Sequence, residues 1–230
     1  MKEQNRDIEK LMNNTKVDSN IVSYALNNVL PKYDSNIGGH GKDHIITVIY
    51  RSFEIIKEFG LDVDPKLIFI AALYHDIGYK KDPDNHEAVS SEMFLSDDEI
   101  KTYFTEYEIR LISDAIVDHR ASLEYEARNI CGKILSSADR ETSVENMLKR
   151  SFLYQLDKHQ NENPSVMDVI NYSYEKLSKK YGRQGYAKMY YPDKKYTDFL
   201  EEMRLLIENK PAFVDAEVEI SKTLGLKKDN

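Results

Sequence analysis

The sequence predicts an all-α protein, folded as a helical bundle of about nine or ten helices. Apolar residues recur at helical spacing through most of the chain, and no segment alternates apolar and polar residues as a half-buried strand does. The most apolar stretch, residues 67–74, has no polar face. A short helix that is hydrophobic on every side is typical of the centre of a domain, so we expect the other helices to surround this stretch.

The composition bounds the class of protein. A chain of 230 residues with 41% hydrophobic residues can build a sizeable core. The net charge of -8 argues against a general nucleic-acid binder but leaves room for a local cationic pocket for a phosphate. Cys131 is the single cysteine, which excludes an internal disulfide and favours a reducing compartment. Without a leader pattern or an apolar run of membrane-spanning length, we expect a cytoplasmic protein with no membrane contact.

Capping residues and helix breakers divide the N-terminal half of the chain. Ser19 can cap a helix that Pro31 stops, and Gly60 can end a longer one. Asp64 is a typical N-cap residue, and Pro65 is typical of the first position of a helix. From these signals we expect a weakly helical stretch at 3–14, helices at 20–30, 44–59 and 66–75, and a glycine-rich loop at 34–43.

Similar signals divide the C-terminal half. Asn85 can cap one helix, and Thr105 with Glu108 forms a capping-box pattern that begins the next. Further helices are bounded by Pro164, Gly182, Pro192 and Pro211. We expect these helices at about 124–138, 143–160, 166–181, 195–209 and 212–223, with an irregular, tyrosine-rich segment at 183–193.

Four of the six histidines and two aspartates form an ordered series along these helices. His75 and Asp76 end the central apolar helix, where two unpaired polar groups would be costly to bury. His86 lies on the inward face of its helix, and His119 lies at the end of the most apolar stripe of the following helix. The full series is His44, His75, Asp76, His86, His119 and Asp139.

These side chains have the chemistry of metal ligands. Imidazole and carboxylate donors without a thiolate suit iron, manganese, nickel, cobalt or zinc in an open catalytic site, and argue against a closed structural zinc site. Two sets follow, one of His44, His75, Asp76 and Asp139, and one of His86 and His119 with Asp76 as a bridge. Taken singly, each histidine is more typical of a hydrogen-bonded core residue, so only the ordered set favours metal. We interpret His40 as a loop residue or outer contact, and His159 as a surface residue.

The ordered set resembles the HD-domain superfamily of metal-dependent phosphohydrolases, over about 34–140 and more weakly in the C-terminal helices. His44 corresponds to the family's first histidine, and the doublet lies in Tyr-His-Asp-Ile-Gly-Tyr at 74–79. Asp139, in Ser-Ala-Asp-Arg, corresponds to the last aspartate. The two remaining histidines of the series look like the extra pair of members that bind two ions. We therefore interpret 1–230 as a single HD-type domain, with a metal-site core at about 34–140 and additional helices at about 143–224.

The sequence also departs from the family pattern. Many members have a basic residue three positions after the first histidine, where this chain has Thr47. Many have a lysine directly after the doublet and its Ile-Gly, where this chain has Tyr79 followed by Lys80 and Lys81. Both departures concern the positions that would contact a phosphate.

The resemblance implies one or two divalent ions and cleavage of a phosphoester or phosphoanhydride in a small phosphorylated substrate, such as a nucleotide. A metal ion lowers the pKa of its bound water, so that hydroxide could attack phosphorus while Asp76 holds the metal and nearby cations stabilise the developing charge. The cations beside the expected ligands are Lys80, Lys81, Arg120 and Arg140. Acid–base help could come from Asp118, Glu87 or Asp43.

Two other functions remain open from the sequence. A di-iron oxygenase is one, because some HD-like folds with extra histidines use oxygen. A non-catalytic module that binds a nucleotide and regulates a partner is the other, although the intact ligand series argues against it. The oligomeric state is not determined by the sequence, and a homo-oligomer is one of the states that it allows.

Overall fold

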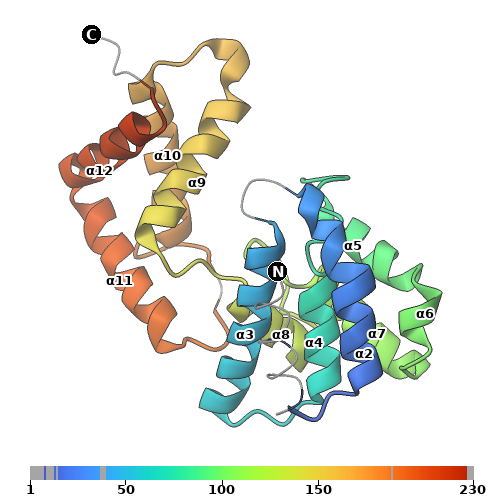
Figure 1. Cartoon of the computed structure of the whole chain (residues 1–230). Helices are drawn as coiled ribbons and strands as arrows, with labels where there is room; N and C mark the ends of the chain where they lie inside the picture. Colours follow the sequence, from blue (N-terminus) through green and yellow to red (C-terminus); the bar gives the residue numbers. More distant parts are fainter. Residues whose placement is uncertain (1–7, 9–12, 14, 37–39, 188, 227–230) are drawn as a thin grey trace. The chain divides into compact units, whose positions relative to one another are not determined.

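The structure, a computed structural model, describes Ile8, Asn13 and residues 15–36, 40–187 and 189–226. Within these residues every regular element is a helix and none is a strand, which confirms the all-α prediction. The chain forms two compact units, one of residues 1–139 and 189–191 and one of residues 140–188 and 192–230 (Figure 1). Most of the stretch expected at 3–14 and the centre of the glycine-rich loop lie outside the described residues. The single-domain interpretation stays a prediction.

The first unit is built around one buried helix. Its elements are α2 (Ser19–Tyr24), η1 (Ala25–Val29), η2 (Leu30–Ser35), α3 (Lys42–Phe59), α4 (Pro65–Tyr74), α5 (His86–Leu95), α6 (Asp98–Lys101), α7 (Glu106–Val117) and α8 (Ile130–Ala138). Helix α4 contacts η1, α3, α5, α7 and α8 (Figure 1). All its residues from Leu67 to Tyr74 are buried, so the apolar run is the centre of this unit, as the sequence predicts.

Local capping explains most helix boundaries in this unit. The Asp64 side chain accepts a hydrogen bond from the Lys66 amide at the start of α4. Gly60 ends α3 in the left-handed conformation, at φ 60°, which a residue without Cβ adopts at little cost. Thr105 and Glu108 form the predicted capping box at the start of α7.

The expected helix at 20–30 differs from the structure at both ends. Asp18, rather than Ser19, is the N-cap and accepts a hydrogen bond from the Asn20 amide. Pro31 does not stop the helical path, which continues as the π-helix η1 and the 3₁₀ helix η2. Pro31 lies in the first turn of η2, where its missing N–H leaves no hydrogen bond unmade.

The helix expected at 124–138 begins only at Ile130. Asp118 causes this difference, because its buried carboxylate accepts hydrogen bonds from the Arg128 amide at 2.7 Å and from the Tyr125 hydroxyl at 2.9 Å. The Arg128 guanidinium also donates to this carboxylate, through Nε at 2.9 Å. These contacts hold residues 118–128 as an irregular loop, and Asn129 then caps α8.

The second unit is also helical. It contains α9 (Val144–Lys158), η3 (Gln160–Glu162), α10 (Val166–Tyr181), α11 (Lys194–Glu208) and α12 (Lys210–Thr223), within about two residues of the predicted bounds. Helices α9, α10 and α12 meet at a buried polar contact, where the Ser173 hydroxyl lies 2.8 Å from that of Ser151 and donates to the Glu217 carboxylate. None of the described helices in either unit is long and apolar enough to cross a membrane.

Candidate metal centre

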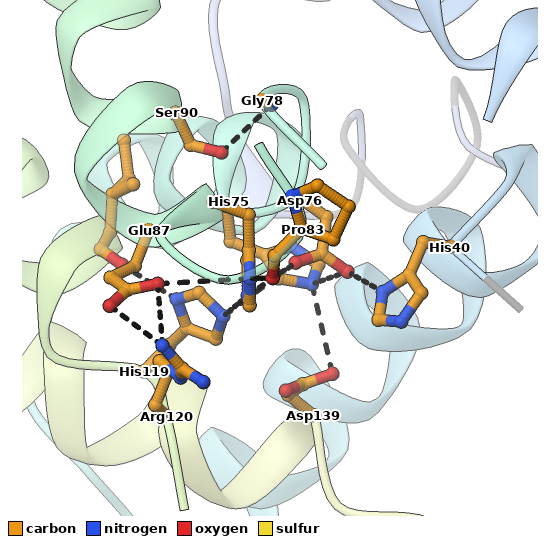
Figure 2. Close-up of polar contacts among 12 residues, drawn as sticks. His40, His75, Asp76, Gly78, Pro83, Glu87, Ser90, His119, Arg120 and Asp139 are labelled. Atoms are coloured by element: carbon orange, nitrogen blue, oxygen red, sulfur yellow. Dashed lines mark hydrogen bonds and ion pairs between the residues drawn. The ribbon is translucent and has the colours of Figure 1, made fainter. Parts of the chain in front are cut away.

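The six predicted ligands converge in the first unit from the ends of different helices. Their positions are His44 in the first turn of α3, His75 and Asp76 directly after α4, His86 at the start of α5, His119 two residues after α7, and Asp139 at the C-cap of α8. Figure 2 shows four of them, His75, Asp76, His119 and Asp139. Helix ends are where two adjacent side chains can turn toward one point, because the regular 100° rotation per residue stops there. The sequence pattern therefore predicted a real spatial cluster.

The turn that carries His75 and Asp76 is fixed from outside α4. The Tyr33 hydroxyl donates to the Leu73 carbonyl at 2.6 Å, and the Asn36 side chain donates to the Asp76 carbonyl at 3.2 Å. These bonds use carbonyl groups at the end of α4 that have no partner within the helix. They hold the doublet where the apolar run ends.

Four side chains form the first set of candidate ligands. The Nε2 atom of His44 lies 3.1 Å from Asp139 Oδ1 and 3.3 Å from Asp76 Oδ2. The Nε2 atom of His75 lies 3.2 Å from Asp76 Oδ2 and 3.7 Å from Asp139 Oδ1. All four donor atoms lie within 4.8 Å of one another, which is compatible with ligands about 2.0–2.2 Å from one ion.

Three side chains form the second set, which shares Asp76 with the first. The Nε2 atoms of His86 and His119 lie 3.4 and 3.6 Å from Asp76 Oδ1, and 3.2 Å from each other. Oδ1 is buried and accepts no hydrogen bond. A buried carboxylate oxygen without a partner is costly, and a cation between these three atoms would satisfy it.

The histidine rings are oriented by their other nitrogen atoms. The Nδ1 atoms of His75, His86 and His119 lie 2.8, 3.0 and 2.6 Å from the carbonyl oxygens of Ala72, Pro83 and Ile116. A carbonyl oxygen only accepts hydrogen bonds, so each Nδ1 carries a hydrogen and the Nε2 atom of each ring is directed toward the cluster. This arrangement is typical of metal-binding histidines.

The electrostatics of the cluster follow from burial and from the two carboxylates. Burial opposes a charge on His75, but Asp76 and Asp139 outweigh it and raise the pKa of His75 well above its ordinary value. The pKa of His44 is raised for the same reason. Burial would raise the pKa of Asp76, but His75 and hydrogen bonds from neighbouring imidazoles outweigh it and hold that pKa well below the ordinary value. Both carboxylates are therefore ionised at neutral pH.

His119 behaves differently from the first set. Burial lowers its pKa to about 4, and the neighbouring His75 adds to this effect. His119 is therefore neutral at pH 7, the form in which an imidazole binds a metal ion.

The expected cations contact the cluster less directly. Arg120 donates to the Asp84 carbonyl at 2.7 Å and pairs with Glu87 at 3.0 Å, so its guanidinium is held beside α5 (Figure 2). Lys80 is exposed, and Lys81 lines a surface pocket of about 500 Å³ with Tyr24 and Asp97. Arg140 is buried in the second unit, so its role beside Asp139 stays a prediction.

The three acid–base candidates are also engaged. Asp118 holds the 118–128 loop through Arg128, and Glu87 pairs with Arg120. Asp43 lies in the first turn of α3, where its carbonyl accepts a hydrogen bond from the Thr47 hydroxyl. The carboxylates of Asp118 and Glu87 accept structural contacts, and Asp43 places its negative charge in the first turn of α3, so none is singled out as a proton donor to a substrate.

Two further residues lie beside the centre, His40, which we expected to be a loop residue or outer contact, and Arg51, which the sequence did not identify. His40 Nδ1 lies 2.6 Å from Asp76 Oδ2 (Figure 2). The His40 ring also stacks on that of Tyr79. Arg51 is buried and donates to the Ala138 carbonyl at 3.3 Å, which satisfies the end of α8 next to Asp139. Arg51 lies seven residues after His44 on the same helix face, and that spacing is a signal that could have identified it.

An all-α unit with a buried cluster of histidines and carboxylates able to hold metal ions defines the class of this protein. The family model of the HD domain matches residues 41–143, a range that includes all six side chains of the cluster. This match is consistent with the HD-domain superfamily and indicates a metal-dependent hydrolase. No curated protein and no solved structure matches the chain.

Proposed function

We propose that this protein is a metal-dependent phosphohydrolase that cleaves a phosphoester or phosphoanhydride in a nucleotide or other small phosphorylated metabolite. One observation carries the proposal. The two carboxylate oxygens of Asp76 face two different pairs of imidazole nitrogens, Oδ2 toward His44 and His75 and Oδ1 toward His86 and His119. A carboxylate shared in this way could hold two ions close together, as in a two-metal hydrolytic site.

Each residue of the cluster has a part in the proposal. His44, His75 and Asp139 would hold one ion with Asp76 Oδ2, and His86 and His119 would hold a second ion with Asp76 Oδ1. The donor set suits iron, manganese, nickel, cobalt or zinc. When bound, such ions lower the pKa of coordinated water and stabilise negative charge on a phosphoryl group.

The surrounding residues would bind and orient the phosphate. Arg120 is held by Glu87 at the side of the cluster where His86 lies, and part of its side chain is exposed. We assign it to a phosphate oxygen of the substrate, because a guanidinium can donate two hydrogen bonds to one phosphate. Lys80 and Arg140 stay candidates for the remaining phosphate charge. The single cysteine, Cys131, is buried, in keeping with the reducing, cytosolic location that we propose.

The activity is tested on chelator-stripped protein reconstituted under anaerobic conditions with Mn²⁺, Fe²⁺, Co²⁺, Ni²⁺ or Zn²⁺. Phosphate and pyrophosphate release is measured from a panel of nucleotides and small phosphorylated metabolites. We expect release with at least one metal, loss of release in His75→Ala, and full release in His159→Ala, whose histidine lies in the second unit. Release that survives a strong chelator, or full activity in His75→Ala, would contradict the proposal.

A di-iron oxygenase is the second candidate, and the donor set itself favours it, because four imidazoles and two carboxylates also suit a pair of iron ions. The same assay separates the two functions. Hydrolysis proceeds in the absence of oxygen, whereas an oxygenase with Fe²⁺ consumes oxygen and gives no product without it.

A further inference from the structure

His40 lies outside both sets of candidate ligands but is in direct contact with the residue that they share. Its Nδ1 atom lies 2.6 Å from Asp76 Oδ2, the shortest of the contacts that this oxygen makes with imidazole nitrogens. An imidazole N–H donates to a carboxylate oxygen, so His40 is the donor of this hydrogen bond and Asp76 the acceptor. The His40 side chain is only 14% exposed.

The His40 ring is itself held in place. It stacks on the ring of Tyr79, with the ring centroids 3.7 Å apart and the planes 16° from parallel. The Asn36 side chain donates to the carbonyl oxygens of both His40 and Asp76, at 3.1 and 3.2 Å. The donor and the carboxylate are thus tied together through side chains and through the backbone.

We propose that His40 is a positioning residue, which fixes the Asp76 carboxylate so that Oδ1 is presented to His86 and His119. This inference rests on the two-ion arrangement of the proposed function. Rotation of an aspartate carboxylate about its last bond is broad and has no steep staggered wells. A short hydrogen bond to Oδ2 restricts that rotation and thereby fixes the direction of Oδ1, which accepts no hydrogen bond of its own.

The two ions depend on this orientation to different degrees. The first set contains His44, His75 and Asp139 besides Asp76, so three ligands remain if the carboxylate rotates. The second set contains only His86 and His119 besides Asp76, so the same rotation removes one of three protein ligands. Loss of the His40 hydrogen bond therefore weakens the second ion more than the first.

The chain offers a matched control for this test. His159 also places its Nδ1 atom near a carboxylate oxygen, that of Glu162 at 3.0 Å. Its ring also stacks on a tyrosine, Tyr172, at 4.1 Å and 19°. This pair of contacts lies in the second unit, so His159→Ala removes the same kind of interaction from a unit that does not contain the cluster.

The experiment is an anaerobic Mn²⁺ titration of the full chain, with stoichiometry from metal analysis and the state of the ions from electron paramagnetic resonance. In the wild type we expect two ions per chain and the signal of an exchange-coupled pair. In His40→Ala we expect the dissociation constant of the second ion to rise about tenfold to a hundredfold, the typical effect of losing an outer partner of a ligand. The first ion should change by less than about threefold, and the coupled signal should give way to that of isolated Mn²⁺.

Two further variants separate positioning from a general loss of structure. In His40→Asn the side-chain amide can donate from nearly the position of Nδ1, so we expect the second ion to be retained. Tyr79→Phe keeps the stacked ring and should behave as the wild type, whereas Tyr79→Ala should resemble His40→Ala. His159→Ala should bind both ions normally.

If the wild type binds two ions and His40→Ala binds both with unchanged affinity, His40 does not position Asp76, and the proposed function stands. If His40→Ala loses both ions equally, or His40→Asn restores nothing, the positioning role is also wrong. A wild type that saturates at one ion overturns this inference together with the two-ion arrangement, while a wild type that binds no ion contradicts the proposed function itself.

Discussion

The Nε2 atoms of His86 and His119 lie 3.2 Å apart, although 33 residues separate these histidines in the chain. Their Nδ1 atoms are occupied by the carbonyls of Pro83 and Ile116, so each ring presents a lone pair to the other. Two facing lone pairs repel unless a proton or a cation lies between them. The shared neighbour is Asp76 Oδ1, which is buried and has no hydrogen-bond partner.

We therefore predict that His86→Ala and His119→Ala each lower the metal content from two ions to one. Each variant removes one of three ligands of the second ion and leaves the first set complete. Phosphate release should fall by more than about tenfold, because losing a ligand costs at least as much as losing an outer partner of one. Metal analysis after anaerobic reconstitution checks this prediction. If neither variant loses metal, the two histidines bind substrate instead.

Gly78→Ala should disturb the same half of the centre without touching a ligand. A Cβ at this position would lie 2.7 Å from the Ser90 amide nitrogen and 2.8 Å from Val89 Cβ, which is closer than real contacts allow. The clash pushes α5, which begins with His86, away from the turn after α4. We expect a loss of about 1–3 kcal/mol in the free energy of unfolding and weaker binding of the second ion.

Urea unfolding and Mn²⁺ titration measure both effects of Gly78→Ala. Gly41→Ala is the matched control, because a Cβ there would meet only the Asn36 carbonyl oxygen, at an ordinary 3.8 Å. If Gly78→Ala and Gly41→Ala are equally stable, the prediction of a steric clash at Gly78 is wrong.

Glu217 gives the second unit a pH-dependent stability. Burial raises its pKa from 4.5 to about 8, and the hydrogen bond from Ser173 offsets only part of that rise. Between these two values the folded chain keeps the proton while the unfolded chain releases it, so stability falls as pH rises from about 4.5 to about 8 and then levels off. A shift of this size corresponds to as much as about 5 kcal/mol.

Glu217→Gln keeps the shape of the side chain and cannot ionise. We predict that it is more stable than the wild type at pH 8 and similar to it near pH 5, so that its stability falls less steeply between these values. Urea unfolding from pH 5 to 9 tests this. Glu219→Gln, which alters an exposed glutamate on the same helix, is the control and should keep the wild-type pH profile. Parallel profiles for the wild type and Glu217→Gln would show that Glu217 does not titrate in this range.

The helices were predictable where their signals are local. The apolar run of α4, its Asp64 cap and the capping box before α7 depend on residues within one turn of each other, and all three occur in the structure. The start of α8 was not predictable, because Asp118 and Arg128 hold the preceding loop through contacts that compete with a helix. The helical sequence pattern continues through that loop. Only the structure therefore shows that hydrogen bonds to Asp118 replace a helix there.

The candidate centre was predictable as a set because its order and its helix positions repeat a known pattern. The contacts around it were not. His40 lies in a glycine-rich segment without periodicity, and its contacts to Asp76 and Tyr79 join residues more than 35 positions apart. The engagement of Asp118 by Arg128 likewise depends on how the loop folds back, which no local pattern in the sequence records.

Anomalous diffraction from crystals grown with Mn²⁺ tests most directly whether Asp76 bridges two metal ions. We predict two anomalous peaks about 3.5–4 Å apart, one beside the Nε2 atoms of His44 and His75 and one beside those of His86 and His119, with the Asp76 carboxylate between them. A single peak, or two peaks of which only one contacts Asp76, would contradict the account.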